Sequence, residues 1–269
     1  MSSGMKKYQL ATSLAQLHEE LHQQLKGKHI VIRCKVAKNT FTLFQRNIHQ
    51  RIKPASTVKL FLLKTLFDLN IDVNRWLKVE DHHIRKGSGN NLKAGHHYLV
   101  KDLIVNLMVA SSNTAACVLQ DYVEKLLGEN YVNYLNKTHL KNDLFNINLV
   151  DSHGLTNQNQ YVSVSDFSKI LDSYIGEKKI LKWMNIEQHE FSSQEKHEVQ
   201  IINTYKNLNH NHCIGVKTGT LVPGVFNIVV FFKFKRLQGY IIAFYNQDAE
   251  SRTDEIQNNL ALLKEYSVG

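Results

Sequence analysis

Leucines recur at a helical period near the start of the chain. They lie in a polar segment of residues 7 to 26 that ends beside Gly27, and they are Leu10, Leu14, Leu17, Leu21 and Leu25. This spacing predicts an amphipathic helix. A signal peptide would show a continuous apolar stretch instead, so we expect either that such a segment has been removed or that the protein stays in the cytoplasm.

Runs of alternating and β-branched residues follow this helix and return near the C-terminus. His29 to Val36 and Thr40 to Phe44 are separated by Ala-Lys-Asn, which is typical of a β-hairpin. The helical period returns from Ala249 to Tyr266, with Asp248 as its N-cap. Between hairpin and final helix, runs rich in Val, Ile and Phe predict strands at residues 213 to 218, 225 to 235 and 238 to 245.

The middle of the chain has the period of helices. Apolar positions recur every three to four residues in residues 57 to 70, 101 to 108, 112 to 127, 130 to 137 and 164 to 175. This order predicts an α+β protein whose two chain ends build one antiparallel sheet of about five strands, flanked by the N- and C-terminal helices. We expect a single domain over residues 1–269, with a discontinuous α/β lobe (7–55 and 206–269) and an all-helical lobe (56–205). Ligand sites are common where two lobes meet.

Composition is that of a globular protein and narrows the choice of partners. Of the 269 residues, 43% are hydrophobic and 21% charged, and no apolar run approaches the roughly 20 residues of a membrane span. The formal net charge of +9 is scattered along the chain. It is compatible with an anionic cell wall or envelope, but no basic run or aromatic-basic motif indicates nucleic-acid binding. We expect a monomer with no nucleic-acid partner and no membrane span.

Cysteines and histidines indicate neither a disulfide framework nor a metal site. Cys34, Cys117 and Cys213 are odd in number and widely separated, which predicts free, buried thiols. The 14 histidines include neighbours such as His82 and His83, without a Cys, Asp or Glu at ligand spacing. We therefore expect histidines in loops and no metal.

The segment Pro54-Ala-Ser-Thr-Val-Lys59 places a serine and a lysine three residues apart at the start of a predicted helix. At this spacing the Lys59 amine can reach the Ser56 hydroxyl, and the positive end of the helix dipole can stabilise an oxyanion. The amine must lose its proton to act as a base, so burial and a nearby positive charge such as Lys217 should lower its pKa. Alone, the pair also fits a helix N-cap beside a surface lysine.

Two further motifs follow in order, Ser111-Ser-Asn113 and, on a predicted strand, Lys217-Thr-Gly219. With Ser56-x-x-Lys59 they form a set that resembles the class A β-lactamases and the related D,D-peptidases. The resemblance covers almost the whole chain, since it continues in three more segments: the Thr-Ala-Ala after Asn113, the strand Gly224-Val-Phe-Asn-Ile-Val-Val, and Ala249-Glu-Ser-Arg252. It implies a β-lactamase/transpeptidase-like fold and an extracytoplasmic location.

The resemblance also implies a catalytic set of Ser56, Lys59, Ser111 and Lys217. Ser56 attacks the carbonyl of a β-lactam or a D-alanyl peptide, and Lys59 takes or relays its proton. Ser111 passes a proton to the departing nitrogen. Nucleophile, base and oxyanion donors all come from protein, so no metal or organic cofactor is implied.

Substrate binding is implied for residues on the third motif and beside the second. Asn113 bonds the amide side chain of the substrate, while Lys217 and Thr218 hold its carboxylate. Gly219 lets the strand backbone approach, and the N–H of Thr220 completes an oxyanion hole with that of Ser56. Arg252 is a further carboxylate-binding candidate, with a surface salt bridge as the alternative.

Two positions depart from the class A pattern. Ser112 stands where that family usually has Asp, a largely structural position. The segment of residues 146 to 157 contains no glutamate to activate the deacylating water, and Asp151-Ser-His-Gly-Leu is instead similar to D,D-carboxypeptidases. Asp151 is either a substitute for that base or a turn residue before Gly154. A side chain shorter by one methylene is poorly placed for this chemistry.

The leading expectation is therefore a class A β-lactamase type of serine hydrolase, acylated at Ser56 and slow in deacylation. The first alternative is a D,D-carboxypeptidase or penicillin-binding protein. A β-lactam sensor that stays acylated and an esterase with the same Ser-Lys machinery remain open. The substrate in the first three cases is a β-lactam or a D-alanyl peptide.

Overall fold

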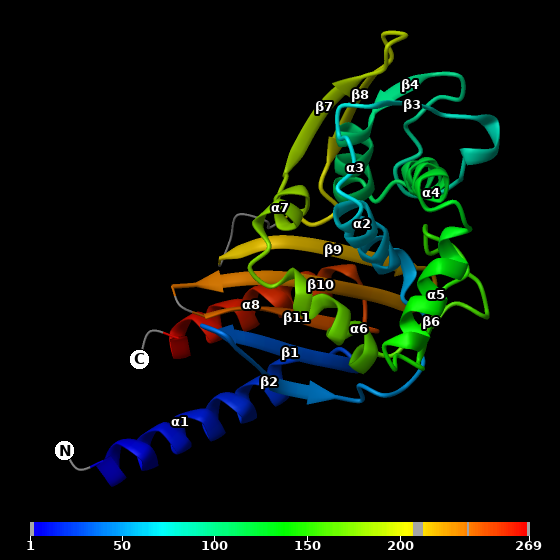
Figure 1. Ribbon diagram of the computed structural model, residues 1–269. Helices are drawn as coiled ribbons and strands as arrows, with labels where there is room; N and C mark the ends of the chain where they lie inside the picture. Colours follow the sequence, from blue (N-terminus) through cyan, green and yellow to red (C-terminus); the bar gives the residue numbers. More distant parts are fainter. Residues whose placement is uncertain (1–2, 207–211, 236, 268–269) are drawn as a thin grey trace.

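A five-stranded antiparallel sheet forms the centre of the protein in the computed structural model, which describes residues 3–206, 212–235 and 237–267 (Figure 1). The strand order is β2-β1-β11-β10-β9. The strands are β1 (His29–Val36), β2 (Asn39–Arg46), β9 (Cys213–Leu221), β10 (Val225–Phe234) and β11 (Leu237–Phe244). The expected α+β fold, with one sheet built from both ends of the chain, is confirmed.

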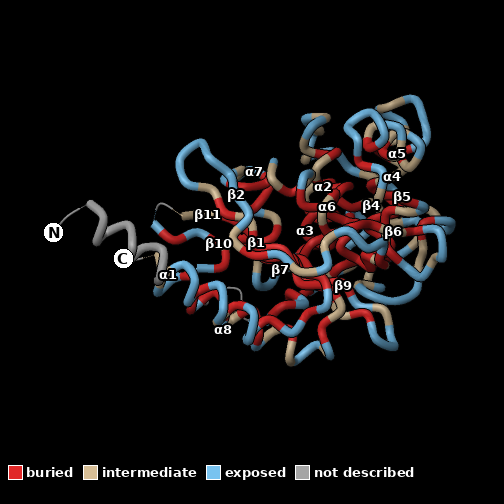
Figure 2. The backbone as a smooth tube through the Cα atoms, turned by 90° about the horizontal axis from the view of Figure 1, so that it is seen from below, coloured by how far each residue is buried: buried red, intermediate tan, exposed pale blue. Residues whose placement is uncertain are grey.

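Helices cover both faces of this sheet. The terminal helices α1 (Ser3–Gln24) and α8 (Ala249–Ser267) lie side by side on one face (Figures 1 and 2). In β10, Ile228, Val230 and Phe232 pack in the core on that side, whereas Val229 and Phe231 join the core on the opposite side. Because both faces are buried, the strand sequence is apolar almost throughout instead of alternating.

The second face carries α6 (Val164–Leu171) and the helices of the middle of the chain. These helices are α2 (Lys59–Asp68), α3 (Val100–Val109), α4 (Asn113–Leu127), α5 (Tyr131–Lys141) and α7 (Lys178–Leu181). Short 3₁₀ turns are η1 (Ala55–Val58), η2 (Asp81–His83), η3 (Asp172–Tyr174) and η4 (Lys182–Met184). All five predicted helical segments are present, although helix α2 proper begins only at Lys59.

The middle of the chain is not all helical, which corrects one expectation. Three two-stranded sheets occur there: β3 (Trp76–Lys78) with β4 (His97–Leu99), β5 (Ile147–Asn148) with β6 (Tyr161–Val162), and β7 (Gln188–Ser192) with β8 (Glu198–Ile202). Strands of two to five residues are too short to show a period of their own. Their pairing depends on tertiary contacts.

Two further expectations can be compared with the described residues. Cys34, Cys117 and Cys213 are buried free thiols, as predicted. None of the described helices combines the length and the apolar character that crossing a lipid bilayer demands.

Candidate active site

The Ser56–Lys59 pair lies where α2 meets the sheet. Turn η1 packs against β9 and β10, which places Ser56 at the edge of the sheet beside the third motif. The Nζ of Lys59 donates a hydrogen bond of 2.8 Å to Ser56 Oγ. Lys59 is completely buried, so it is not the surface lysine of the alternative interpretation.

Three acceptors surround the Lys59 amine. Besides Ser56 Oγ, the Nζ donates to Asn113 Oδ1 at 2.9 Å and to the carbonyl oxygen of His153 at 2.6 Å. These three contacts match the three donors of an ammonium. Burial lowers the pKa of Lys59 to about 7, and the negative charge of Asp151 opposes this shift. The expected effect of burial is therefore present, and the repulsion between the charges of Lys59 and Lys217 lowers the pKa of Lys217.

Ser111 and Lys217 form a second lysine–serine pair. Lys217 is buried on β9, and its Nζ donates 2.8 Å to Ser111 Oγ and 2.7 Å to the carbonyl oxygen of Thr218. Burial, followed by the positive charges of Lys59 and Arg252, holds the pKa of Lys217 well below its usual value. Ser111 has a left-handed φ of 57°, a strained conformation of the kind that collects at functional sites.

The second motif also begins helix α4. Ser112 is its N-cap: the Oγ accepts from the N–H of Ala115 at 3.1 Å and donates to the carbonyl of Gly89 at 2.8 Å. This hydroxyl thus caps the helix where an Asp is usual in class A enzymes. Asn113 follows, and its Nδ2 donates to the carbonyl of Lys86 at 3.0 Å while its Oδ1 accepts from Lys59. Both ends of the amide are therefore held from within the protein.

Asp151 shapes the loop that faces the lysine. Its Oδ1 accepts from the N–H groups of His153 at 3.0 Å and Gly154 at 2.6 Å, and from Gln160 Nε2 at 3.2 Å. This is the bonding of an Asx turn, which favours the turn interpretation over a substitute base. The turn is what presents the His153 carbonyl oxygen to Lys59.

Glycines let this loop and the edge strand approach the nucleophile. Gly154 has a φ of 83°, and a Cβ there would lie 2.2 Å from the carbonyl oxygen of Ala55 and 2.8 Å from Ser56 N. A Cβ on Gly219 would lie 3.1 Å from Ser56 N. Gly219 therefore provides close packing of β9 against the serine turn. The neighbouring N–H of Thr220 lies on the same strand, and the Thr220 side chain is exposed.

Arg252 lies below the third motif and not at the surface. It is 5% exposed, and its Nη1 donates to Thr220 Oγ1 at 3.2 Å and to the carbonyl of Asn227 at 3.1 Å. Burial lowers its pKa to about 10. Among the described residues it forms no salt bridge, so the structure does not support the surface ion-pair alternative. Thr218 is held from the other side, since its Oγ1 bonds Thr204 Oγ1 at 2.7 Å.

Two residues that position the catalytic pair were not predicted from the sequence. Asn227 is fully buried on β10, and its Nδ2 donates to the carbonyls of Lys53 at 3.0 Å and Pro54 at 3.1 Å, which fixes the turn before Ser56. An asparagine inside an apolar strand was the available signal. The His153 carbonyl had no such signal, because any residue supplies a carbonyl oxygen.

Three residues that a metal could use also lie together, away from the motif residues. His82 and His83 each place Nε2 near Asp121 Oδ2, at 3.1 Å and 2.9 Å. Asp121 lies on α4, far along the chain from the two histidines, so the spacing of residues in the sequence did not indicate this acidic partner. His83 Nδ1 accepts from the N–H of Glu80, so its Nε2 carries the proton and donates to Asp121. Burial lowers the pKa of His83, which favours this neutral ring. The contacts are those of a hydrogen-bonded network.

Comparisons with known proteins agree on one family. A profile of D-alanyl-D-alanine carboxypeptidases (peptidase S11) matches residues 18–230. A curated relative, the D-alanyl-D-alanine carboxypeptidase DacF of Bacillus subtilis strain 168, is 20% identical over 224 residues. These residues are 81% of this chain and 57% of DacF, so the chain spans little more than half of that relative's length.

Solved structures share the fold at low sequence identity. The D-alanyl-D-alanine carboxypeptidase DacD of Francisella tularensis has a TM-score of 0.77 at 17% identity, covering 91% of this chain and 71% of that chain. The Streptomyces K15 DD-transpeptidase has a TM-score of 0.75 at 17% identity, covering 88% and 97%. Likeness at this identity concerns the fold alone.

The family match decides between two expectations from the sequence. It supports the D,D-carboxypeptidase alternative better than the leading expectation of a class A β-lactamase. The two classes share the three motifs, so the informative segment was residues 146–157, which lacks the β-lactamase glutamate. Because the profile covers most of the chain and all three motifs, the protein belongs to the D-alanyl-D-alanine carboxypeptidase (peptidase S11) family.

Proposed function

We propose that the protein is a serine D,D-carboxypeptidase that removes the terminal D-alanine of a peptide ending in D-alanyl-D-alanine. The observation that carries this proposal is the bonded pair Lys59–Ser56, at 2.8 Å between a buried amine of lowered pKa and a hydroxyl. The family supports the substrate class.

Acylation begins with proton transfer from Ser56 to Lys59. With a pKa of about 7, a substantial fraction of Lys59 is a neutral amine near neutral pH. The neutral amine takes the hydroxyl proton as Ser56 Oγ forms a bond to the carbonyl carbon of the penultimate D-alanine. The oxyanion that results accepts hydrogen bonds from the N–H groups of Ser56 and Thr220.

The second lysine–serine pair, Lys217 and Ser111, protonates the leaving group. Ser111 Oγ gives a proton to the departing nitrogen as the peptide C–N bond breaks, and Lys217 replaces that proton through the 2.8 Å bond between them. Free D-alanine leaves and an acyl-enzyme on Ser56 remains. At this point Lys59 still carries the serine proton and Lys217 lacks one, so Lys59 first loses its proton, through solvent, to Lys217. Water then attacks the ester with the neutral Lys59 as the base, because residues 146–157 supply no glutamate for this step. Breaking the ester returns a proton to Ser56 Oγ and releases the shortened peptide.

The C-terminal carboxylate of the substrate is recognised by positive charge along β9. Lys217 and Thr218 contact it, and Arg252 adds a buried positive charge beneath Thr220. An approaching carboxylate favours the protonated form of Lys217, whose pKa is low in the empty site. The same residues accept the carboxylate of a β-lactam. The β-lactam carbonyl acylates Ser56, and the resulting acyl group is released slowly.

Release of D-alanine from a diacylated L-lysyl-D-alanyl-D-alanine peptide tests the proposal. The wild type and the surface control Ser173→Ala release D-alanine, and Ser56→Ala does not. Intact-protein mass spectrometry with benzylpenicillin is expected to show one lasting adduct, absent from Ser56→Ala. A transient adduct with accumulating penicilloate and no D-alanine release would establish a β-lactamase instead. No adduct and no D-alanine release would exclude both functions.

A further inference from the structure

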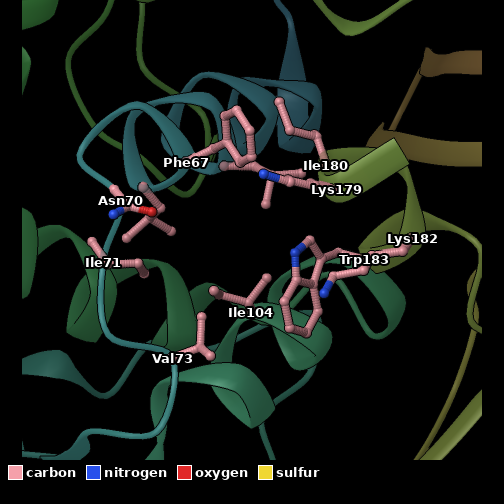
Figure 3. Close-up of a pocket in the computed structure, with 11 residues that line it drawn as sticks. Phe67, Asn70, Ile71, Val73, Ile104, Lys179, Ile180, Lys182 and Trp183 are labelled. Carbon is pink, nitrogen blue, oxygen red and sulfur yellow. The ribbon is translucent and has the colours of Figure 1, made fainter. Parts of the chain in front are cut away.

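A cavity of about 350 Å³ opens between α2, α3 and the α7–η4 segment (Figure 3). Its wall is apolar: Phe67, Ile71, Val73, Ile104 and Trp183 surround the space. Ile104 is buried, while the other four side chains are partly exposed to the cavity mouth. The size falls within the range of small-ligand pockets, roughly 300 to 1,000 Å³.

Two lysines give this apolar cavity a positive rim. Lys179 on α7 extends across the opening towards Phe67, and Lys182 lies beside Trp183, with Nζ 4.5 Å from the ring centroid (Figure 3). Both lysines are exposed, and neither forms a salt bridge within the described part of the chain. No acidic residue belongs to the described lining. The charge is therefore available to a ligand.

We propose that this cavity binds the anion of a medium-chain fatty acid. An apolar wall with ammonium groups only at the rim fits a ligand that is hydrocarbon along its length and anionic at one end. The chain lies against Ile104 and Trp183, and the carboxylate pairs with Lys179 and Lys182. Cationic amphiphiles are repelled by the same rim, and neutral ones gain only the apolar contacts. The proposal is independent of the peptidase activity.

Trp183 provides a direct readout. The chain has two tryptophans, so Trp76→Phe, a change on the exposed strand β3, leaves Trp183 as the single tryptophan, whose emission is selected by exciting at the red edge of the absorption band. Titration of this variant with decanoate, below its micelle concentration, is expected to change the fluorescence in a saturable way. Decanol should bind more weakly by more than about fivefold, because it lacks the ion pairs with both lysines. Decyltrimethylammonium should bind more weakly still.

Matched variants distinguish binding in the cavity from nonspecific attraction of the anion to surface lysines. Lys179→Met should weaken decanoate binding about fivefold, whereas Lys178→Met, which removes the same charge from the same helix outside the cavity, should not. Val73→Phe fills the mouth and should abolish saturation, with its thermal unfolding temperature measured as a check of folding.

Three outcomes would overturn the proposal. The first is a fluorescence change that appears only at the micelle concentration. The second is equal weakening by Lys178→Met and Lys179→Met. The third is saturation by decanoate that persists in a folded Val73→Phe protein.

Discussion

The Nζ of Lys59 lies 2.8 Å from Ser56 Oγ, inside a site where burial lowers the lysine pKa to about 7. Only the neutral amine accepts the serine proton. The rate constant of acylation by benzylpenicillin should therefore rise about tenfold per pH unit below about pH 7 and level off above it. Stopped-flow measurement of acylation between about pH 5 and about pH 9 checks this. A flat profile would exclude Lys59 as the base.

Asp151→Asn should shift the rising part of this pH–rate profile to lower pH. The negative charge of Asp151 raises the pKa of Lys59, so its removal lowers that pKa, by less than about one unit for a partly exposed group. The asparagine oxygen can still accept the turn bonds from His153 and Gly154. Asp143→Asn changes an exposed residue and is the control; it should leave the pH–rate profile unchanged. An unchanged profile in Asp151→Asn would contradict the electrostatic effect of Asp151 on Lys59.

Gly154→Ala and Gly128→Ala form a matched pair. Both glycines have left-handed φ angles, 83° and 70°, but a Cβ would meet Ala55 at 2.2 Å only at position 154, and open space at 128. Gly128→Ala should cost about 1 kcal/mol of unfolding free energy, the strain of the backbone alone. Gly154→Ala should cost more, about 3 kcal/mol, and slow acylation because the Ser56 turn is displaced. Urea denaturation and penicillin labelling measure both effects, and equal losses would show that the contact is unimportant.

Asn227→Leu tests the asparagine that holds the serine turn. The change removes the amide partner of the Lys53 carbonyl and of the Tyr245 N–H, whereas the Pro54 carbonyl keeps its bond from Thr57 Oγ1; it should lower the free energy of unfolding by about 3 kcal/mol. Acylation should slow as well. The neighbouring core change Ile228→Val should cost about 1 kcal/mol and leave acylation unchanged. If acylation by Asn227→Leu matched that of Ile228→Val, the turn would not depend on this residue.

His139 should make stability depend on pH. The ring is 4% exposed, its Nδ1 has no hydrogen-bond partner, and burial lowers its pKa to about 4. An unfolded histidine titrates near 6.5, so the unfolded chain binds more protons between these values. Stability is complete above about pH 6.5 and is lost as the pH falls towards 4, by up to about 3 kcal/mol.

His139→Gln removes the titrating ring and should flatten this dependence in urea denaturation at about pH 7 and about pH 5. The exposed His49→Gln should retain it. An unchanged slope in His139→Gln would assign the effect to other groups.

The sequence predicts the sheet and the three motifs because each leaves a pattern in consecutive residues. A run such as Val225–Phe234 is apolar because both faces of β10 are buried, and a serine and lysine three apart share a helix face. What the sequence could not predict comes from tertiary contact. The His153 carbonyl has no side-chain signature, and Asp121 meets His82 and His83 only because α4 folds against the η2 turn.

The pairing of the first strand with the last has a consequence for folding. His29 in β1 lies opposite Phe244 in β11, so these neighbouring strands are separated by most of the intervening chain and are synthesised at very different times. Such non-local pairing closes a long loop and gives a high contact order, which slows folding. A nascent chain that ends before β9 carries Ser56 and Lys59 without Lys217 or the sheet edge that fixes the serine turn. Competence for acylation therefore arises late, and chains truncated before residue 213 should take no penicillin label.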